Sequence, residues 1–279
     1  MSALTVALDG GPYALAATPD GVMWVTLVHA GAVARIGRDG AVSRIEVGPG
    51  SRPSQICAGP DGAIWFSCAG TDRLGRVAGD SVEFVELPTG SAPFGICSGP
   101  DSAVWFTAMD SGVIGRVAGG EIEVVAEPRG GPSMITAGGD GALWFTLNQK
   151  SAIGRVSVAG ELSVRPTPTP AAGPVGICAT HDDAVWFTEI GADKLGRIPL
   201  HDAIQELDLP GEPHAVIADE ADGVWVSLWG ADSIARVSAD GEAAVFELPS
   251  GSEPHGLALD RDGAVWVALE SGYVVRLPV

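Results

Sequence analysis

Residues 92–128 read APFGICSGPDSAVWFTAMDSGVIGRVAGGEIEVVAEP, and this stretch decides the fold because it recurs along the chain. Apolar and β-branched runs alternate with turn sequences at PDS, DSG and AGG, which predicts four short antiparallel strands. Three anchors mark the copy: Pro93, Trp105 twelve residues later, and Arg116 eleven residues after the tryptophan. Four strands in a unit of about 40 residues are typical of one blade of a β-propeller.

The three anchors occur seven times in register. The tryptophans are 39 to 42 residues apart: Trp24, Trp65, Trp105, Trp144, Trp186, Trp225 and Trp266. A proline precedes each by twelve residues: Pro12, Pro53, Pro93, Pro132, Pro174, Pro213 and Pro254. An arginine follows each by eleven residues, ten in the last copy: Arg35, Arg76, Arg116, Arg155, Arg197, Arg236 and Arg276. We therefore predict a single domain over residues 1–279, an all-β seven-bladed β-propeller of four-stranded antiparallel blades.

The two ends of the chain complement each other. The last copy ends at VVRLPV (residues 274–279) without a fourth strand, whereas LTVALDG (residues 4–10) resembles fourth-strand segments such as VEFVELP (residues 82–88). We therefore expect the N-terminal strand to pair in the last blade and close the ring. The repeated tryptophans are expected in the core between blades. The repeated arginines are expected to be structural residues, either solvated or ion-paired.

Composition excludes several partners. The net charge of −19, from 35 acidic and 16 basic residues, disfavours binding to nucleic acid or to an anionic membrane surface. No apolar run is long enough to span a membrane, and the N-terminus has no basic, apolar leader, so we expect a cytoplasmic protein. We also expect a monomer. The four cysteines form no CxxC pair, which argues against zinc or redox sites.

Function is expected where the copies differ. Residues beside each proline, and residues three or four after each tryptophan, should lie at one mouth of the ring. Two of the five histidines fall directly after prolines, in Glu212-Pro213-His214 and Glu253-Pro254-His255. Ring closure should bring Tyr13, which follows Pro12, beside these two histidines. Large or polar residues that follow the tryptophans are Asn148, Glu189, Trp229 and Glu270.

These residue types indicate a particular chemistry. Converging carboxylates can hold a hard cation such as Mg²⁺, which prefers oxygen ligands and keeps several waters. A neutral histidine can accept a proton near physiological pH. A metal and a base without an obvious serine or cysteine nucleophile favour proton abstraction beside a carbonyl over acyl transfer.

The DGxxWFT…IGRV repeats, with EPHG in the last blade, resemble the virginiamycin B lyase family over the full chain. The resemblance implies Mg²⁺-dependent β-elimination that opens the ester ring of type B streptogramins, which are cyclic depsipeptide antibiotics. It implies that His255 is the general base and that Glu253 is a magnesium ligand. It also implies that His214 is a second catalytic histidine, which contacts the substrate and protonates or positions the ester leaving group. Tyr13 is implied to lie near the substrate. Glu270 is the best candidate for the second glutamate that binds the metal. Its blade has one residue fewer between the tryptophan and the arginine than the other blades have.

Phe94 and Trp229 are further candidates for contacts with an aromatic depsipeptide. Three alternatives stay open: a calcium-dependent lactonase, a non-catalytic interaction propeller of the NHL-repeat type, and a related lyase on another substrate. The lactonase is disfavoured because such sites use several asparagines and this chain has only Asn148.

Overall fold

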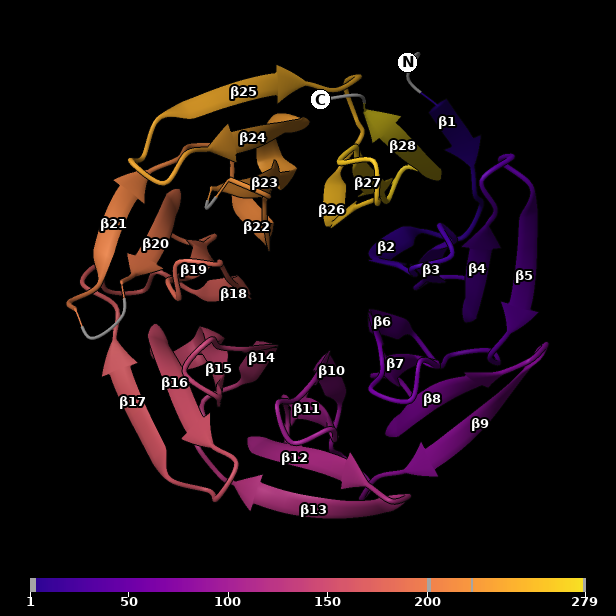
Figure 1. Ribbon diagram of the computed structural model, residues 1–279, viewed down its shortest axis with the longest axis horizontal. Helices are drawn as coiled ribbons and strands as arrows, with labels where there is room; N and C mark the ends of the chain where they lie inside the picture. Colours follow the sequence, from indigo (N-terminus) through magenta and orange to yellow (C-terminus); the bar gives the residue numbers. More distant parts are fainter. Residues whose placement is uncertain (1–3, 200–201, 222, 278–279) are drawn as a thin grey trace.

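The predicted ring of blades is confirmed. The computed structural model describes residues 4–199, 202–221 and 223–277, and these form seven four-stranded antiparallel sheets arranged around a central axis (Figure 1). The ends of the predicted domain, residues 1–3 and 278–279, lie outside the described residues.

Each blade runs from an inner strand near the axis to an outer strand at the perimeter (Figure 1). The inner strands begin at the repeated prolines: β2 (Pro12–Ala17), β6 (Pro53–Ala58), β10 (Pro93–Ser98), β14 (Pro132–Ala137), β18 (Pro174–Ala179), β22 (Pro213–Ala218) and β26 (Pro254–Leu259). The second strands carry the tryptophans: β3 (Met23–Leu27), β7 (Ile64–Cys68), β11 (Val104–Ala108), β15 (Ala142–Leu147), β19 (Val185–Glu189), β23 (Val224–Leu228) and β27 (Val265–Leu269). The third strands carry the arginines: β4 (Ala32–Ile36), β8 (Arg73–Ala78), β12 (Val113–Ala118), β16 (Ala152–Ser157), β20 (Lys194–Ile198), β24 (Ser233–Val237) and β28 (Tyr273–Leu277). The outer strands are β5 (Val42–Glu46), β9 (Ser81–Glu86), β13 (Glu121–Ala126), β17 (Leu162–Pro166), β21 (Gln205–Asp208), β25 (Ala243–Glu247) and β1 (Leu4–Ala7).

A hydrogen-bonded triad explains why tryptophan and arginine recur together. In the third blade, Asp101 accepts a hydrogen bond from Trp105 Nε1 at 2.8 Å and another from Arg116 Nη1 at 2.7 Å. Trp105 and Arg116 are cross-strand partners, and the guanidinium lies 5.4 Å from the centre of the indole ring. The triad satisfies the buried indole N–H. Of the two expectations for the repeated arginines, solvated or ion-paired, the ion-paired one holds for Arg116.

The residue after each tryptophan has a complementary cross-strand partner. Where it is a phenylalanine, as at Phe106, the partner is a glycine such as Gly115. A Cβ at Gly115 would lie 2.4 Å from the Phe106 ring, so the ring occupies the space that a side chain would need. Where the residue is a valine, as at Val25, the partner is the larger Ala34. A larger residue after the tryptophan is therefore matched by a smaller residue on the neighbouring strand.

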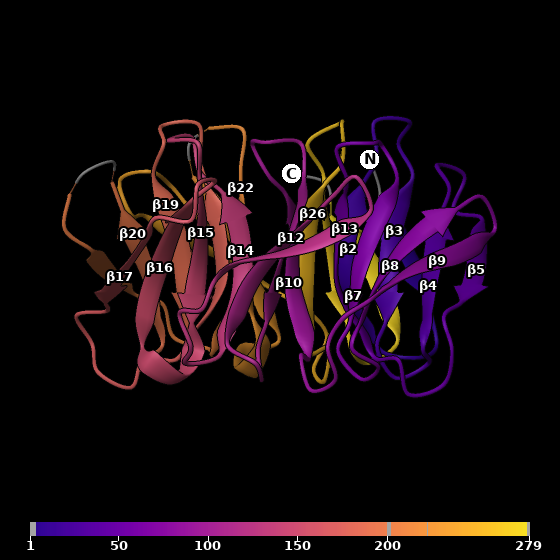
Figure 2. The ribbon, with the colours of Figure 1, turned by 90° about the horizontal axis from the view of Figure 1, so that it is seen from below.

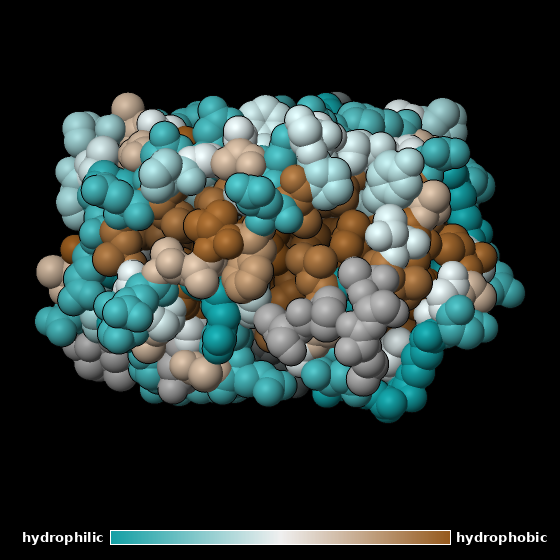
Figure 3. All heavy atoms as spheres, turned by 90° about the horizontal axis from the view of Figure 1, so that it is seen from above, coloured by the Kyte–Doolittle hydropathy of each residue, from teal (hydrophilic) through white to brown (hydrophobic). Residues whose placement is uncertain are grey.

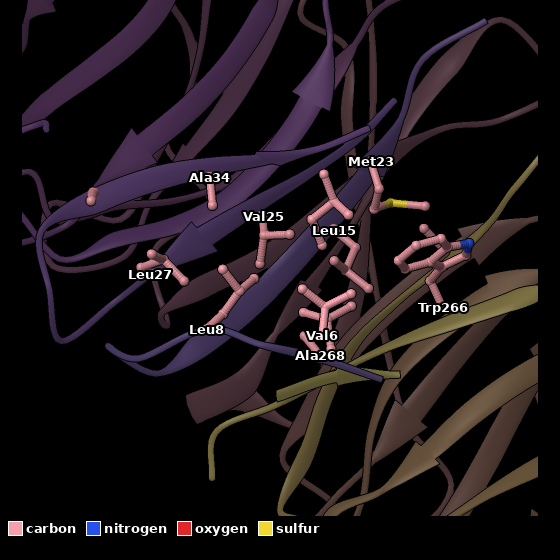
Figure 4. Packing of buried hydrophobic residues seen from close by; sticks show 13 residues of the cluster. Val6, Leu8, Leu15, Met23, Val25, Leu27, Ala34, Trp266 and Ala268 are labelled. Carbon is pink, nitrogen blue, oxygen red and sulfur yellow. The ribbon is translucent and has the colours of Figure 1, made fainter. Parts of the chain in front are cut away.

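The N-terminal strand closes the ring as expected. β1 pairs antiparallel with β28, with Leu4 opposite Arg276 and Ala7 opposite Tyr273. Figure 4 shows the side chains that pack at this junction between the last and the first blade. They include Val6, Leu8, Leu15, Met23, Val25, Trp266 and Ala268, all less than a tenth exposed. Pairing and packing together join the two ends of the chain.

The turns gather at two opposite faces of the ring, as the side view in Figure 2 shows. A hydrophobic band runs between two more hydrophilic rims on the side seen in Figure 3. Exposed apolar residues occur on outer strands, for example Val42, Val124 and Val245. Among the described residues, no helix has the length and apolar character that crossing a membrane requires.

Candidate active site

The predicted site residues lie at one face of the ring, which we call the mouth: the face where the inner strands begin. Antiparallel pairing sets Pro254 opposite Leu269, so the chain after β27 returns to the start of β26. The Glu270 amide donates to the Glu253 carbonyl at 3.1 Å, and the Trp229 amide donates to the Glu212 carbonyl at 3.2 Å. The two segments predicted to share a mouth are therefore adjacent in the structure.

Four aromatic side chains, each from a different blade, meet at the mouth. The His214 and His255 rings are 4.6 Å apart between centroids and nearly perpendicular. Tyr13 lies 4.6 Å from His255 and 6.1 Å from His214, and its other neighbour is Phe94 at 6.3 Å. The phenol and the two imidazoles thus come together as ring closure predicted, with Phe94 against the phenol.

Glu270 binds His255 directly. The Nε2 atom of His255 lies 2.5 Å from Glu270 Oε2, and only 9% of the histidine side chain is exposed. Burial alone would raise the pKa of Glu270, but its hydrogen bonds to His29 and His255 lower it overall. Because Glu270 is ionised near neutral pH, His255 Nε2 carries the proton and donates it. The lone pair is then on Nδ1, which is buried and has no hydrogen-bond partner among the described residues.

Both histidines are uncharged at neutral pH. Burial lowers the pKa of His255 and outweighs the opposing hydrogen bond to Glu270. Burial lowers the pKa of His214 further, to about 3, and the neighbouring His255 adds to this effect. Burial also raises the pKa of Tyr13, and the charge of Glu270 adds to that increase, so the phenol keeps its proton. The cluster therefore offers neutral imidazoles and a neutral phenol.

Glu253 and Glu270 are the two candidate metal ligands. The Glu253 side chain is exposed and forms no side-chain hydrogen bond among the described residues. Each Glu270 oxygen receives one hydrogen bond, which leaves further acceptor capacity on the carboxylate. The described part of the chain contains no group of three or more His, Cys, Asp or Glu side chains placed to hold a metal ion. Two carboxylates fit Mg²⁺, which usually takes one or two from a protein and completes its shell with water and substrate oxygens.

The remaining candidates fall into two groups. Trp229 begins the short 3₁₀ turn η2 (Trp229–Ala231), is 37% exposed, and lies 6.3 Å from the His255 ring. Phe94 is half-buried against Tyr13. The expectation for Glu189 was wrong, because its side chain is fully buried and neither carboxylate oxygen has a hydrogen-bond partner among the described residues. The reason is that residues three after the tryptophan are buried in the packing of the blades, as Leu147 and Leu228 are, whereas Trp229 and Glu270, four after it, are partly exposed.

His29 is a site residue that the sequence reasoning missed. Its Nε2 atom lies 2.6 Å from Glu270 Oε1, on the other side of the carboxylate from His255. It is five residues after Trp24, one position beyond those considered. His29 could have been identified from the sequence, because it lies in a turn at the mouth of the first blade, which is next to the blade of Glu270 around the ring.

Comparison with known proteins shows which family the chain belongs to. The model of the virginiamycin B lyase family matches residues 1–277. A curated virginiamycin B lyase of Mycobacterium sp. (strain KMS) is 72% identical over 47 residues, which is 17% of this chain and 17% of that protein. The aligned part thus spans about a sixth of the length of such curated relatives.

Solved structures match over the whole chain. A virginiamycin B lyase from Staphylococcus aureus is 34% identical and has a TM-score of 0.95, covering 100% of this chain and 99% of that one. A catalytically inactive histidine-to-alanine form of the Staphylococcus aureus protein, with quinupristin, is 34% identical with a TM-score of 0.94, over 100% of this chain and 99% of that one. Because the family model and full-length structures of the family match the entire ring, this chain belongs to the virginiamycin B lyase family.

Proposed function

We propose that this protein is a lyase that opens the ester ring of a type B streptogramin by Mg²⁺-dependent β-elimination. The observation that carries the proposal is the neutral, nearly buried His255 bound to Glu270 beside His214 and Tyr13, in a chain of this family. The similar Staphylococcus aureus structure with quinupristin supports a substrate of this class.

His255 is the general base in this proposal. Glu270 fixes the orientation of the imidazole and stabilises the imidazolium that forms when the base takes a proton. The lowered pKa of His255 leaves its lone pair unprotonated at neutral pH. Because that lone pair is on the buried Nδ1, substrate binding has to bring the reacting proton to this atom. A histidine and a carboxylate in this arrangement remove a proton without any covalent intermediate.

The atoms of the reaction balance without water. His255 removes the proton from the threonyl Cα, the bond between Cβ and the ester oxygen breaks, and the departing group leaves as a carboxylate. The product is a linear peptide with a dehydrobutyrine residue and a free carboxyl group, and its mass equals that of the antibiotic. His214 is uncharged at neutral pH, so we assign it a hydrogen bond to substrate rather than proton donation as an imidazolium.

Glu253 and Glu270 are the residues that would hold Mg²⁺. When bound, the ion polarises the ester carbonyl and stabilises the charge on the departing carboxylate. Phe94 and the partly exposed Trp229 provide apolar surfaces beside the base, against which the aromatic groups of a depsipeptide can pack.

Mass spectrometry tests this function directly. The protein is incubated with a type B streptogramin, with Mg²⁺ and with EDTA. We expect a linear product of unchanged mass that absorbs as a dehydroamino acid, formed only with Mg²⁺. His255→Gln should lower the rate by about 100-fold or more. His181→Gln, which changes an exposed histidine in the turn between β18 and β19, should not alter it.

Two results would contradict the proposal. A product heavier by one water indicates hydrolysis instead of elimination. Absence of turnover, or equal rates for the wild type and His255→Gln, removes the support for an elimination catalysed at this mouth.

A further inference from the structure

The last and first blades are joined at the mouth by one carboxylate between two histidines. Glu270, from the end of β27, has Oε2 on His255 Nε2 and Oε1 on His29 Nε2, at 2.5 Å and 2.6 Å. His29 is 241 residues away along the chain, in the turn between β3 and β4. Without the ring closure these two side chains would have no reason to meet.

The turn that carries His29 is fixed by the segment that leads to Tyr13. The His29 amide donates to the Gly10 carbonyl at 3.0 Å, and the Val28 amide donates to the Gly11 carbonyl at 3.0 Å. Gly11 has a φ of +70°, and a Cβ there would lie 2.4 Å from the His29 ring. The imidazole therefore lies directly on the Gly11 backbone, where only glycine leaves room for it.

Glu270 and His29 each differ from the residues at the equivalent positions of the other six copies. The position of Glu270, four after the tryptophan, is not acidic in any other copy: Val28, Ala69, Met109, Asn148, Ile190 and Trp229. The position of His29, five after the tryptophan, is not histidine in any other copy: Gly70, Asp110, Gln149, Gly191, Gly230 and Ser271. The fold does not need either residue, since the other blades connect their second and third strands without a glutamate or a histidine at these positions.

We propose that His29 is a positioning residue: it holds one oxygen of Glu270 across the closure so that the other oxygen stays on His255. The inference rests on the proposed function for its kinetic part alone. With both carboxylate oxygens bound, rotation of the Glu270 side chain is restricted, and the imidazole of His255 keeps Nε2 protonated. His29 acts through Glu270, and its side chain is 63% exposed, unlike the buried base.

Imidazole NMR tests the structural part without substrate or metal. In the ¹⁵N-labelled wild type at neutral pH we expect His255 as the neutral tautomer with Nε2 protonated. His29→Ala should shift the two ring nitrogens of His255 towards a tautomer mixture. His29→Gln keeps a donor where Nε2 was and should restore most of the wild-type pattern. The matched control is His181→Ala, an exposed histidine of the opposite face, which should leave His255 unchanged.

Kinetics test the positioning part. We expect His29→Ala to lower kcat for ring opening about tenfold at saturating Mg²⁺, with KM changed less than twofold, since loss of such outer contacts costs about 10- to 100-fold. His29→Gln should recover at least half of the lost rate. Circular dichroism and the unfolding midpoint of each variant should match those of the wild type, which separates this effect from misfolding.

Each outcome decides a separate point. Unchanged His255 nitrogens and unchanged kcat in His29→Ala overturn the positioning role, even if the wild type opens the antibiotic. A variant that only needs more Mg²⁺, with full kcat once saturated, makes His29 a metal ligand and also overturns it. If the wild type opens no streptogramin, the proposed function fails, while the NMR comparison still decides whether His29 orients Glu270 and His255.

Discussion

Glu189 offers a stability prediction that depends on burial alone. Its side chain is fully buried with both carboxylate oxygens unpartnered among the described residues, whereas four other blades carry a buried leucine at the same position: Leu27, Leu147, Leu228 and Leu269. We therefore predict that Glu189→Leu stabilises the protein, and that the gain is larger at pH 8 than at pH 5. Leucine fits because the same blade geometry already accommodates it.

The magnitude follows from the protonation of the carboxyl group. Burial, with a contribution from the charge of Glu206, raises the pKa of Glu189 from 4.5 to about 7. Between those values the folded state keeps a proton that the unfolded state loses, so stability falls as pH rises from 4.5 to 7 and then levels off. At pH 8 the ionised carboxylate costs about 3 kcal/mol relative to an exposed glutamate, because one pKa unit corresponds to about 1.4 kcal/mol.

Urea unfolding at pH 5, 6, 7 and 8 measures the effect. Glu189→Leu should gain about 2.5 kcal/mol more at pH 8 than at pH 5, because part of the cost is already present at pH 5. Glu189→Gln should show the same pH trend with a smaller net gain. Glu247→Gln removes one negative charge from the exposed strand β25 and should change stability by less than about 0.5 kcal/mol at any pH. Two results would refute the reasoning. Equal gains at pH 5 and pH 8 would show that the pKa of Glu189 is not raised. A loss of stability at pH 8 would show that Glu189 is ionised and paired with Lys194.

Three further predictions concern the site and the closure. The midpoint of the acid limb of kcat/KM for ring opening should lie below pH 6.5, because burial lowers the pKa of His255; a pH–rate profile whose acid midpoint lies above 6.5 contradicts this. Glu253→Gln should raise the Mg²⁺ concentration for half-maximal activity about tenfold, measured by metal titration; an unchanged midpoint excludes Glu253 as a ligand. Deleting residues 1–8 removes β1 and the buried Val6 and Leu8, and should lower the free energy of unfolding by more than about 4 kcal/mol in urea; a wild-type midpoint would show that the closure contributes little.

The repeat made most of the fold predictable. Each blade reads locally as short runs of strand-forming residues between turn sequences, and the seven copies fix the number of blades. Even the packing rule for Phe106 and Gly115 is local, because the two residues are cross-strand neighbours in one hairpin. Closure by β1 was predictable as well, since the last copy lacks the strand that the N-terminus supplies.

The site was predictable only in part. The residues after Pro12, Pro213 and Pro254 share one place in the repeat, and the ring therefore had to bring Tyr13, His214 and His255 to the same mouth. Burial was not predictable in this way: Glu189 and Glu270 are one repeat position apart, and the first points into the core while the second reaches the mouth.

The sequence by itself determined the ring, its closure and the arc of blades in which the histidines gather, because a repeat encodes its geometry in local spacing. Only the tertiary structure decided that Glu270 lies between His255 and His29, and that burial keeps both mouth histidines uncharged. The physical reason is that a hydrogen bond and a pKa depend on angstrom-scale distances and on exclusion of water. Residues 241 positions apart acquire those distances only when the ring has closed.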